Sequence, residues 1–442
     1  MVLLLVSGVA WLVFSISPPA VVGAPAAALS QLVPDEESGQ PTPPEFFQRS
    51  FPLSPLPVPP ATPGEQPAGP PPSAVAGPYS VAPRPFSLFP TGPPPGWYVL
   101  PSLGLGALLD DNIDNASSKK RSDFITRVAP GVALGFSSPR VNFQFGGSTT
   151  ADIYAVYSEN TRPFSSQTVS LSSAYQLTPA VKLGLNADYS RTDSTTSITN
   201  ELGARVGSGV AQTYSVAPSL AYQFAPRTAI GLGYRLLRNQ LSGGPSNDEH
   251  SASLSLSHRF SPADMGLLDY KFELFEDDGT TRSHVLTAGW SRQLGPNTVA
   301  SVGIGPRFTD DDQDTADVDA AVDFAHRFKY GTLALSYTRT QSIATGMEGI
   351  QDVDSVSAGF AFPPLWRGYL VSISANFTRS DPATQAGEET RSYGLGARVS
   401  RQLTSWLTAD VFYRFTYEDG ASDRTRNVVG IELTASRLYP LR

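Results

Sequence analysis

Apolar and polar side chains alternate along most of the chain after residue 96. In the stretch YLVSISANFTR (369–379), Val371 and Ile373 would point to one face, and Ser372 and Ser374 to the other. An alternation with a period of two residues indicates a β-strand. The stretch alone does not say which of its faces meets water, so the rest of the chain must decide.

Similar segments recur to the end of the chain, and their number predicts about eighteen strands, an even count that suits a bacterial barrel. The predicted strands are residues 97–109, 122–136, 140–157, 167–177, 180–191, 213–224, 227–238, 249–260, 263–276, 281–294, 297–308, 316–328, 330–341, 353–362, 368–378, 391–403, 405–417 and 424–437.

The connections between these segments are alternately short and long. Tight turns such as SSPR (137–140) and GPN (295–297) alternate with polar loops such as TDDDQDT (309–315) and SDPATQAGEE (380–389). Short turns on one side and long loops on the other are typical of outer-membrane barrels. A soluble sandwich or propeller gives no reason for this alternation.

The apolar face of these strands is predicted to face lipid. In residues 263–276, Leu268 and Tyr270 oppose Asp269 and Lys271, and other strands repeat the pattern. Most segments exceed the usual globular strand of about 5–6 residues and match the roughly 9–11 residues that cross a bilayer. Aromatic residues gather at strand ends, where a headgroup boundary would lie. The predicted fold is therefore all-β, a transmembrane antiparallel up-and-down β-barrel in residues 97–442, too wide for side chains to fill its lumen.

Two segments precede the barrel. Residues 1–24 combine an apolar run with Val22-Gly23-Ala24 and are predicted to be a secretory signal peptide, with a membrane anchor as the alternative. Residues 25–96 are rich in proline and predict a disordered periplasmic linker preceding the barrel. A docking segment for a periplasmic partner is the alternative, with phenylalanines as anchors. In both cases the chain is exported, to the bacterial outer membrane.

Composition argues against several classes of function. The chain has no cysteine, four histidines and a formal charge of -8, which disfavours thiolate chemistry and nucleic-acid binding. His258 and His284 lie in predicted strands, but no spacing singles out a serine–histidine–acid set. No phosphate-binding loop of the GxxxxGK[ST] kind is present. We therefore expect no enzyme, no catalytic residue and no cofactor.

Charged loop residues suggest two weaker possibilities. The acidic run at 310–314 could hold a hard divalent ion, but it lacks the glycine and terminal glutamate of an EF-hand loop. A solvated loop explains it, so no metal site is predicted. Lys119, Lys120 and Arg121 are expected at the outer rim, where they would contact lipopolysaccharide phosphates.

Charged residues with inward phase are predicted to line the lumen. A structural lattice of ion pairs would account for most of them, and a field or size filter acting on solutes is the functional alternative. The predicted lumen-lining residues are Arg127, Lys182, Asp188, Arg235, Asp269, Lys271, Glu273, Arg307, Asp317, Asp319, Asp323, Arg398, Asp410, Arg414 and Glu432.

The first predicted hairpin carries a resemblance to a known group of proteins. The stretch LLDDNIDNASSKKRSDFITRVAPGVALGF (108–136) resembles the start of outer-membrane β-barrel proteins encoded with bacterial exopolysaccharide and exosortase loci. The match rests on Asp111-Asn112-Ile113, on Ser122 to Thr126 and on Pro130-Gly131. The chain departs from many outer-membrane proteins at its C-terminus, which is not aromatic.

The resemblance implies a pore that exports an exopolysaccharide across the outer membrane of a Gram-negative bacterium. Its partners would be membrane lipid, lipopolysaccharide, the polysaccharide and a periplasmic export protein that drives the polymer. Two alternatives are a general or solute-selective diffusion porin, which loops folded into the lumen would favour, and a structural or adhesive surface barrel.

Overall fold

The structure is a computed structural model that describes residues 95–192, 210–242, 246–276, 279–310, 315–343, 350–363, 368–382, 389–420 and 423–441. The predicted signal peptide and nearly all of the predicted linker lie outside these residues, so both stay predictions. No helix in the described residues is long and apolar enough to cross a membrane.

Almost all of the described chain is β-strand. The strands are β1 (Gly96–Asp110), β2 (Asp123–Ser137), β3 (Val141–Tyr154), β4 (Arg162–Thr178), β5 (Val181–Thr192), β6 (Ala211–Ala225), β7 (Thr228–Leu241), β8 (Ser246–Arg259), β9 (Asp264–Glu276), β10 (Thr280–Gly295), β11 (Thr298–Asp310), β12 (Thr315–Phe328), β13 (Gly331–Ile343), β14 (Ile350–Ala361), β15 (Tyr369–Pro382), β16 (Thr390–Thr404), β17 (Leu407–Asp419), β18 (Arg424–Ser436) and β19 (Tyr439–Leu441).

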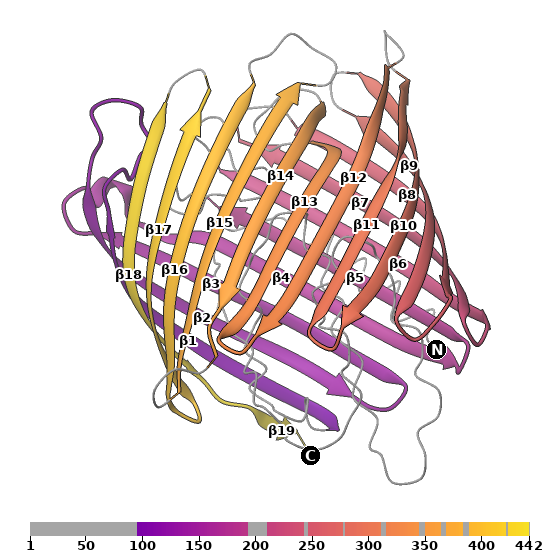
Figure 1. Ribbon diagram of the computed structural model, residues 1–442. Helices are drawn as coiled ribbons and strands as arrows, with labels where there is room; N and C mark the ends of the chain where they lie inside the picture. The colour runs from indigo at the N-terminus through magenta and orange to yellow at the C-terminus, as the bar shows by residue number, and fades with distance from the viewer. Residues whose placement is uncertain are drawn as a thin grey trace.

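Strands β1 to β18 form one closed antiparallel barrel of 18 strands (Figure 1). Each strand pairs with its neighbours in sequence, and β1 pairs with β18 from Ser102↔Ser436 to Asp110↔Val428. The short β19 continues β18 along the first residues of β1. Because closure leaves no free sheet edge between first and last strands, the predicted up-and-down barrel is confirmed.

The predicted strands match β1 to β18 within a few residues at their ends, and the short β19 was not predicted. The largest difference lies between β3 and β4. The strand predicted for 140–157 ends at Tyr154, and the next one begins at Arg162 rather than at residue 167. Between them lies a short 3-10 helix, η2 (Ser158–Asn160). Alternation of apolar and polar residues predicts strands only, so it could not predict this short helical turn.

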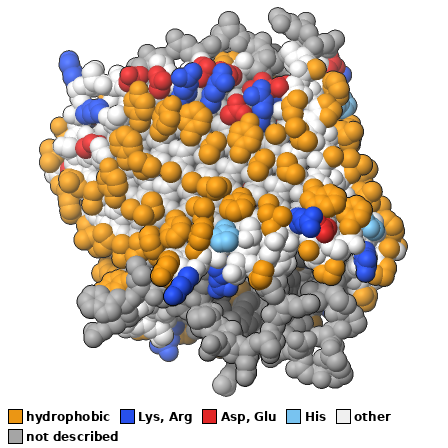
Figure 2. Space-filling model, viewed as in Figure 1, with side chains coloured by type: hydrophobic (Ala, Val, Ile, Leu, Met, Phe, Trp, Pro, Cys, Tyr) orange, Lys and Arg blue, Asp and Glu red, His pale blue; other side chains and the backbone are white. Residues whose placement is uncertain are grey.

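The outer surface has an apolar belt between two charged edges, as Figure 2 shows for one side. Side chains that alternate outward are exposed and apolar; in β15, for example, Ile373 is 50 % exposed. Aromatic rings meet at two levels of the wall. Pairs nearer the short turns are Trp97–Phe136, Phe260–Trp290 and Phe328–Phe360. Pairs nearer the loops are Tyr189–Tyr214, Tyr270–His284 and Phe377–Tyr393.

Candidate functional site

The loop end of the β13–β14 hairpin folds into the lumen. We call its described residues, Thr340–Ile343 and Ile350–Val353, the inward tip. Ile343 and Ile350 pack against Leu237 of β7 and Phe275 of β9, and all four side chains are buried. Since β8 to β12 lie between β7 and β13 in the wall, the tip can reach β7 only across the inside of the barrel.

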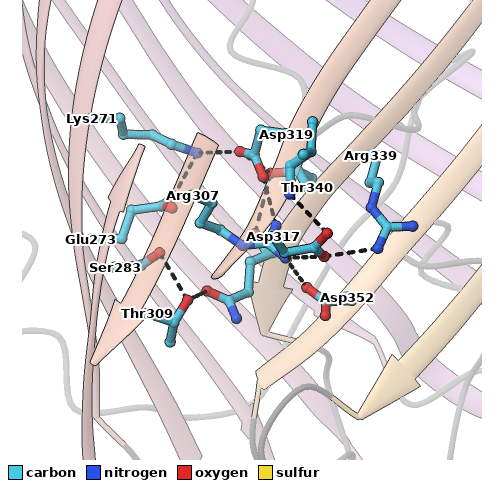
Figure 3. A network of polar contacts seen from close by, with 12 residues as sticks. Lys271, Glu273, Ser283, Arg307, Thr309, Asp317, Asp319, Arg339, Thr340 and Asp352 are labelled. Atoms are coloured by element: carbon cyan, nitrogen blue, oxygen red, sulfur yellow. Dashed lines mark hydrogen bonds and ion pairs between the residues drawn. The ribbon is translucent and has the colours of Figure 1, made fainter. Parts of the chain in front are cut away.

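An arginine on the inner face of β11 holds this tip against the wall. Arg307 is 1 % exposed and contacts three carboxylates: Asp317 at 2.9 Å, Asp319 at 2.6 Å, and Asp352 of the inward tip. Asp317 and Asp319 belong to β12, so one guanidinium joins three strands (Figure 3). Guanidinium groups suit such multiple carboxylate contacts because their five donors lie in a fixed plane.

Two further cations extend these contacts. Arg339 lies 2.8 Å from Asp317 and 3.2 Å from Asp354, and Lys271 lies 2.9 Å from Glu273. We call this set the Arg307 network: Lys271, Glu273, Arg307, Asp317, Asp319, Arg339, Asp352 and Asp354. It combines three cations with five carboxylates, which leaves a formal excess of two negative charges. Nearby, Thr309 donates a hydrogen bond to Gln341 of the tip at 3.2 Å.

The first long connection, residues 111–122, also lies against the inside of the wall. We call it the first loop. Asn112 and Ile113 are 0 % and 1 % exposed. The Asn112 amide donates to the carbonyls of Ala116 and Thr425, at 2.8 and 2.9 Å, and accepts a bond from the Ala116 N–H. Ile113 packs with Ile125 and other apolar residues of β1 to β3. The loop is thus fixed to the barrel by backbone bonds and apolar contact.

A group of arginines lies on the wall beside the first loop. Three of them are paired: Arg127 with Asp152 at 2.7 Å, Arg398 with Asp410 at 3.0 Å, and Arg426 with Asp110. These pairs join neighbouring strands, which is the structural lattice expected as one alternative.

Arg414 of β17 differs from these three arginines. It is exposed on the inner face and has no ion-pair partner among the residues that the structure describes. The charges that act on it are those of Arg127, Arg398 and Arg426, all of the same sign. An unpaired guanidinium that faces the lumen can meet a passing anion.

The remaining predicted lumen residues occupy the inner face by strand alternation. Asp323 accepts bonds from Ser301 and Ser336, at 3.1 and 2.8 Å, and Arg235 lies 3.7 Å from Glu249. Several of the predicted residues therefore form contacts between adjacent strands. Two contacts join strands that are not neighbours in the wall: Lys271 of β9 lies 3.9 Å from Asp319 of β12, and Arg307 of β11 contacts Asp352 of β14. Residues without a charged partner at ion-pair distance in the described ranges are Lys182, Asp269 and Glu432. Asp188 is exposed on the inner face of β5.

The predicted rim residues are only partly free. Lys119 is exposed, Lys120 donates to Thr425, and Arg121 binds Asp114 at 2.5 and 2.6 Å. The hydrogen bonds that Arg121 donates to the Asp114 carboxylate raise the pKa of Arg121. Contact of these residues with lipopolysaccharide phosphates stays a prediction. Of the acidic run at 310–314, only Asp310 is among the described residues.

All four histidines lie on the outer face, at the two aromatic levels. Each Nδ1 shares a hydrogen bond with a hydroxyl of the adjacent strand, at 2.7 to 2.9 Å. The pairs are Tyr234–His250, Thr228–His258, Tyr270–His284 and Thr298–His326. None of these imidazoles faces the lumen, so a general base acting there would have to be another residue type.

The inward tip, Arg339, Asp352 and the buried Asn112 were missed in the sequence. One signal was available for the tip, because the connection between the two strands is flanked by Ile343 and Ile350 and contains Met347, whereas the other long connections are mainly polar. Apolar residues at a loop end suggest a segment that packs inside the barrel.

These features decide where the protein resides. A closed antiparallel barrel with an apolar outer belt, aromatic rings at two levels and a charged inner wall satisfies the hydrogen-bonding requirements of a bilayer. The protein is a bacterial outer-membrane β-barrel. Contact with membrane lipid follows from the belt.

Comparisons with known proteins add one partial family match. The family model described as "Putative MetA-pathway of phenol degradation" matches residues 96–244. No curated protein matches the chain.

Solved outer-membrane barrels are similar in outline. OccAB4 of Acinetobacter baumannii is 10 % identical, with 78 % of this chain and 98 % of that chain covered and a TM-score of 0.43. OpdK of Pseudomonas aeruginosa is 9 % identical, with 77 % and 99 % covered and a TM-score of 0.42. The siderophore receptor PirA of Pseudomonas aeruginosa is 12 % identical, with 78 % and 81 % covered and a TM-score of 0.39. Likeness at this level supports no conclusion about function.

Proposed function

We propose that this barrel is a solute-selective diffusion porin and that the inward tip sets the width of its lumen. The observation that carries the proposal is the docking of Asp352 on Arg307, which fixes a wall hairpin inside the barrel. A segment that narrows a polar lumen limits solute size, and fixed charges around it select among solutes. The proposal includes no enzymatic step.

The solute class follows from two observations. The family description that matches residues 96–244 names phenol degradation, which supports small aromatic compounds as the first solutes to test. Ile343, Ile350, Leu237 and Phe275 form a buried apolar cluster where the inward tip meets the wall of a mainly polar lumen. Small solutes that combine an aromatic ring with a polar group fit both.

Polymer export is the alternative that the resemblance of residues 108–136 implies. The structure gives the residues behind that resemblance a local role. Asp111 accepts bonds from Asn427, Asn112 fixes the first loop, and Ile113 is buried. These contacts explain the motif without a polysaccharide. Export would also require the inward tip to leave the lumen while the polymer passes.

Conductance in planar bilayers tests the porin. We expect the wild-type chain to form small channels whose current falls when a bound solute such as a benzoate is added. Replacement of residues 342–351 by a short Gly-Ser turn should give larger channels with weaker block. The matched control replaces residues 383–388, in the connection between β15 and β16, in the same way.

Two outcomes would contradict the porin, and one would contradict only the role of the inward tip. If neither the wild-type chain nor the variant with the shortened tip conducts, a closed structural or adhesive barrel is favoured. If shortening the tip leaves conductance unchanged, the tip does not set the width. If deletion of the protein abolishes surface polysaccharide and the polymer accumulates in the periplasm, export replaces diffusion as the function.

A further inference from the structure

The barrel wall is interrupted between β12 and β13. Their backbone ladder runs from Phe328↔Gly331 up to Ala320↔Arg339 and ends there. Above that level β12 continues to Thr315, paired only with β11, and β13 continues to Ile343, paired only with β14. Within the described residues, Thr315–Asp319 therefore have no strand partner on the side of β13. We call this interruption the seam.

Side chains bridge the seam in place of backbone bonds. Arg339 binds Asp317 at 2.8 Å, and Thr340 donates to Asp319 at 3.5 Å, which is a long contact. Arg307 adds its bond to Asp352 beyond the seam. An unpaired strand edge in hydrocarbon is costly, so a barrel keeps one only where other groups satisfy it. These few side-chain contacts can separate without breaking the ladder below them.

The seam lies next to exposed apolar side chains of the outer wall. Val318, on the end of β12 that borders the seam, is 42 % exposed, and Phe308 of β11, one strand further from the seam, is 56 % exposed. The outer end of the seam is therefore within reach of the apolar belt rather than wholly above it.

On the inner side, the strands that leave the wall at the seam lead to a buried apolar cluster. Ile343 and Ile350, on the strands that leave the wall here, pack with Leu237 and Phe275 inside the barrel. The Arg307 network (Figure 3) includes both the Arg339–Asp317 contact that bridges the seam and the Arg307–Asp352 contact that holds the inward tip. A solute that moved from the apolar cluster of the tip through the seam to the outer wall would meet apolar, charged and then apolar groups.

We propose that the seam is a lateral exit through which a small, mainly apolar solute with one polar group passes from the lumen to the outer leaflet. The polar group would exchange contacts with the Arg307 network, while the ring moves from the apolar cluster at the inward tip to the apolar belt of the outer wall. This proposal rests on the diffusion function and adds a second path to it: water-soluble solutes pass along the lumen, whereas apolar solutes leave sideways.

A disulfide across the seam tests the proposal, because the chain has no cysteine of its own. Asp319→Cys with Thr340→Cys joins the two edges at the first positions above the ladder. Ala321→Cys with Thr338→Cys joins positions that already face each other in the ladder and is the matched control. Adjacent antiparallel positions have Cα separations that a disulfide can span. Each variant is measured oxidised and reduced, so the substitutions are compared with and without the crosslink.

The two solutes are radiolabelled 1-naphthol, for the lateral path, and arabinose, for the lumen. Uptake of both is followed in cells that lack their major porins and carry each variant. We expect oxidation of the seam pair to reduce 1-naphthol uptake to the level of cells without the protein, to leave arabinose uptake unchanged, and to be reversed by reductant. The control pair should change neither.

Each other outcome counts against the lateral exit in a recognisable way. Unchanged 1-naphthol uptake with a formed seam disulfide, in a chain that still passes arabinose, overturns the exit and leaves the porin intact. Equal loss of both solutes means that the crosslink blocks the lumen, and the exit is again rejected. If the unmodified chain passes neither solute, the diffusion function fails, and the exit fails with it.

Discussion

The first loop and the inward tip both occupy the lumen, but they are held there by different forces. The first loop is fixed by the Asn112 amide, which makes three hydrogen bonds to backbone groups, and by burial of Ile113. The inward tip is held by the charge–charge contacts around Arg307, by the burial of Ile343 and Ile350, and by neutral hydrogen bonds such as that from Thr309 to Gln341.

The two elements also differ in how completely their polar groups are satisfied. Within the described chain, Nε of Arg307 and Oε2 of Glu273 are buried without a hydrogen-bond partner, and the Arg307 network has an excess of carboxylates. A buried network with unsatisfied members and unbalanced charge is less stable than one whose members are all bonded. The comparison indicates that the first loop is a fixed part of the wall and the inward tip a movable one.

The largest effect should come from Arg307→Gln, which removes the cation that holds the inward tip and leaves the first loop unchanged. The substitution leaves Asp317, Asp319 and Asp352 close together without their shared cation. Removing one partner of a buried ion pair costs about 3–5 kcal/mol. We expect the tip to leave the wall, with larger single-channel conductance and faster amide exchange in residues 340–343 and 350–353.

Arg282→Gln is the matched control for that substitution. Arg282 is exposed on the outer face of β10 and has no ion-pair partner among the described residues. Conductance and amide exchange should match the wild type. If R307Q behaved like R282Q, the tip would have to be held by its apolar contacts alone.

Asn112→Ala should have a smaller effect, confined to the first loop. It leaves the Thr425 carbonyl and both Ala116 backbone groups without their side-chain partner. An unsatisfied buried polar group costs about 1–3 kcal/mol. Amide exchange should rise in residues 111–121 and not in the inward tip. Ser118→Ala, at an exposed position of the same loop, is the control, and an equal rise in both variants would contradict the assigned role of Asn112.

The contrast between these elements also shows what the sequence can predict. Strict alternation in segments such as 263–276 fixes both the strand and its outer face, because a shift by one residue would turn every apolar side chain inward. The alternation continues through Thr340–Ile343, yet this segment leaves the wall. Alternation describes the strand and not its neighbours, so it cannot reveal where a ladder between two strands ends.

For the candidate site, too, the sequence predicts which residues face the lumen but not which of them contact one another. Inward phase identifies Arg307, Asp317 and Asp319 as residues of the lumen, but not the meeting of all three with Asp352. Asp352 has outward phase in a regular barrel, and it reaches Arg307 only because β14 bends inward. The motif Asp111-Asn112-Ile113 suggested a family, whereas its physical role depends on contacts with β18 that lie more than three hundred residues away.

Salt concentration should separate the two elements with a still smaller effect. Raising ionic strength from about 0.1 M to about 1 M shortens the screening length from ~10 Å to ~3 Å. Contacts between charges weaken under this change, while apolar packing and backbone bonds do not. Amide exchange in the inward tip should therefore increase with salt and that in the first loop should stay constant. Equal responses would mean that the Arg307 network contributes little to the docking of the tip.

The smallest effect is expected at Arg414, where the charge of the wall below the first loop can be compared with that of the Arg307 network. In the part of the chain that the structure describes, Arg414 is exposed on the wall below the first loop and has no ion-pair partner, whereas the Arg307 network has an excess of carboxylates. At about 8 Å in water, one unit charge contributes about 0.5 kcal/mol to the energy of a passing ion. Because the charge attracts an anion and repels a cation by the same amount, Arg414→Gln should lower the anion-to-cation permeability ratio by about five- to sixfold. Reversal potentials in a salt gradient measure this ratio, and Arg414→Lys, which keeps the charge, should restore it. A ratio that does not change in R414Q would show that ions pass on the side of the inward tip, beyond the reach of this guanidinium.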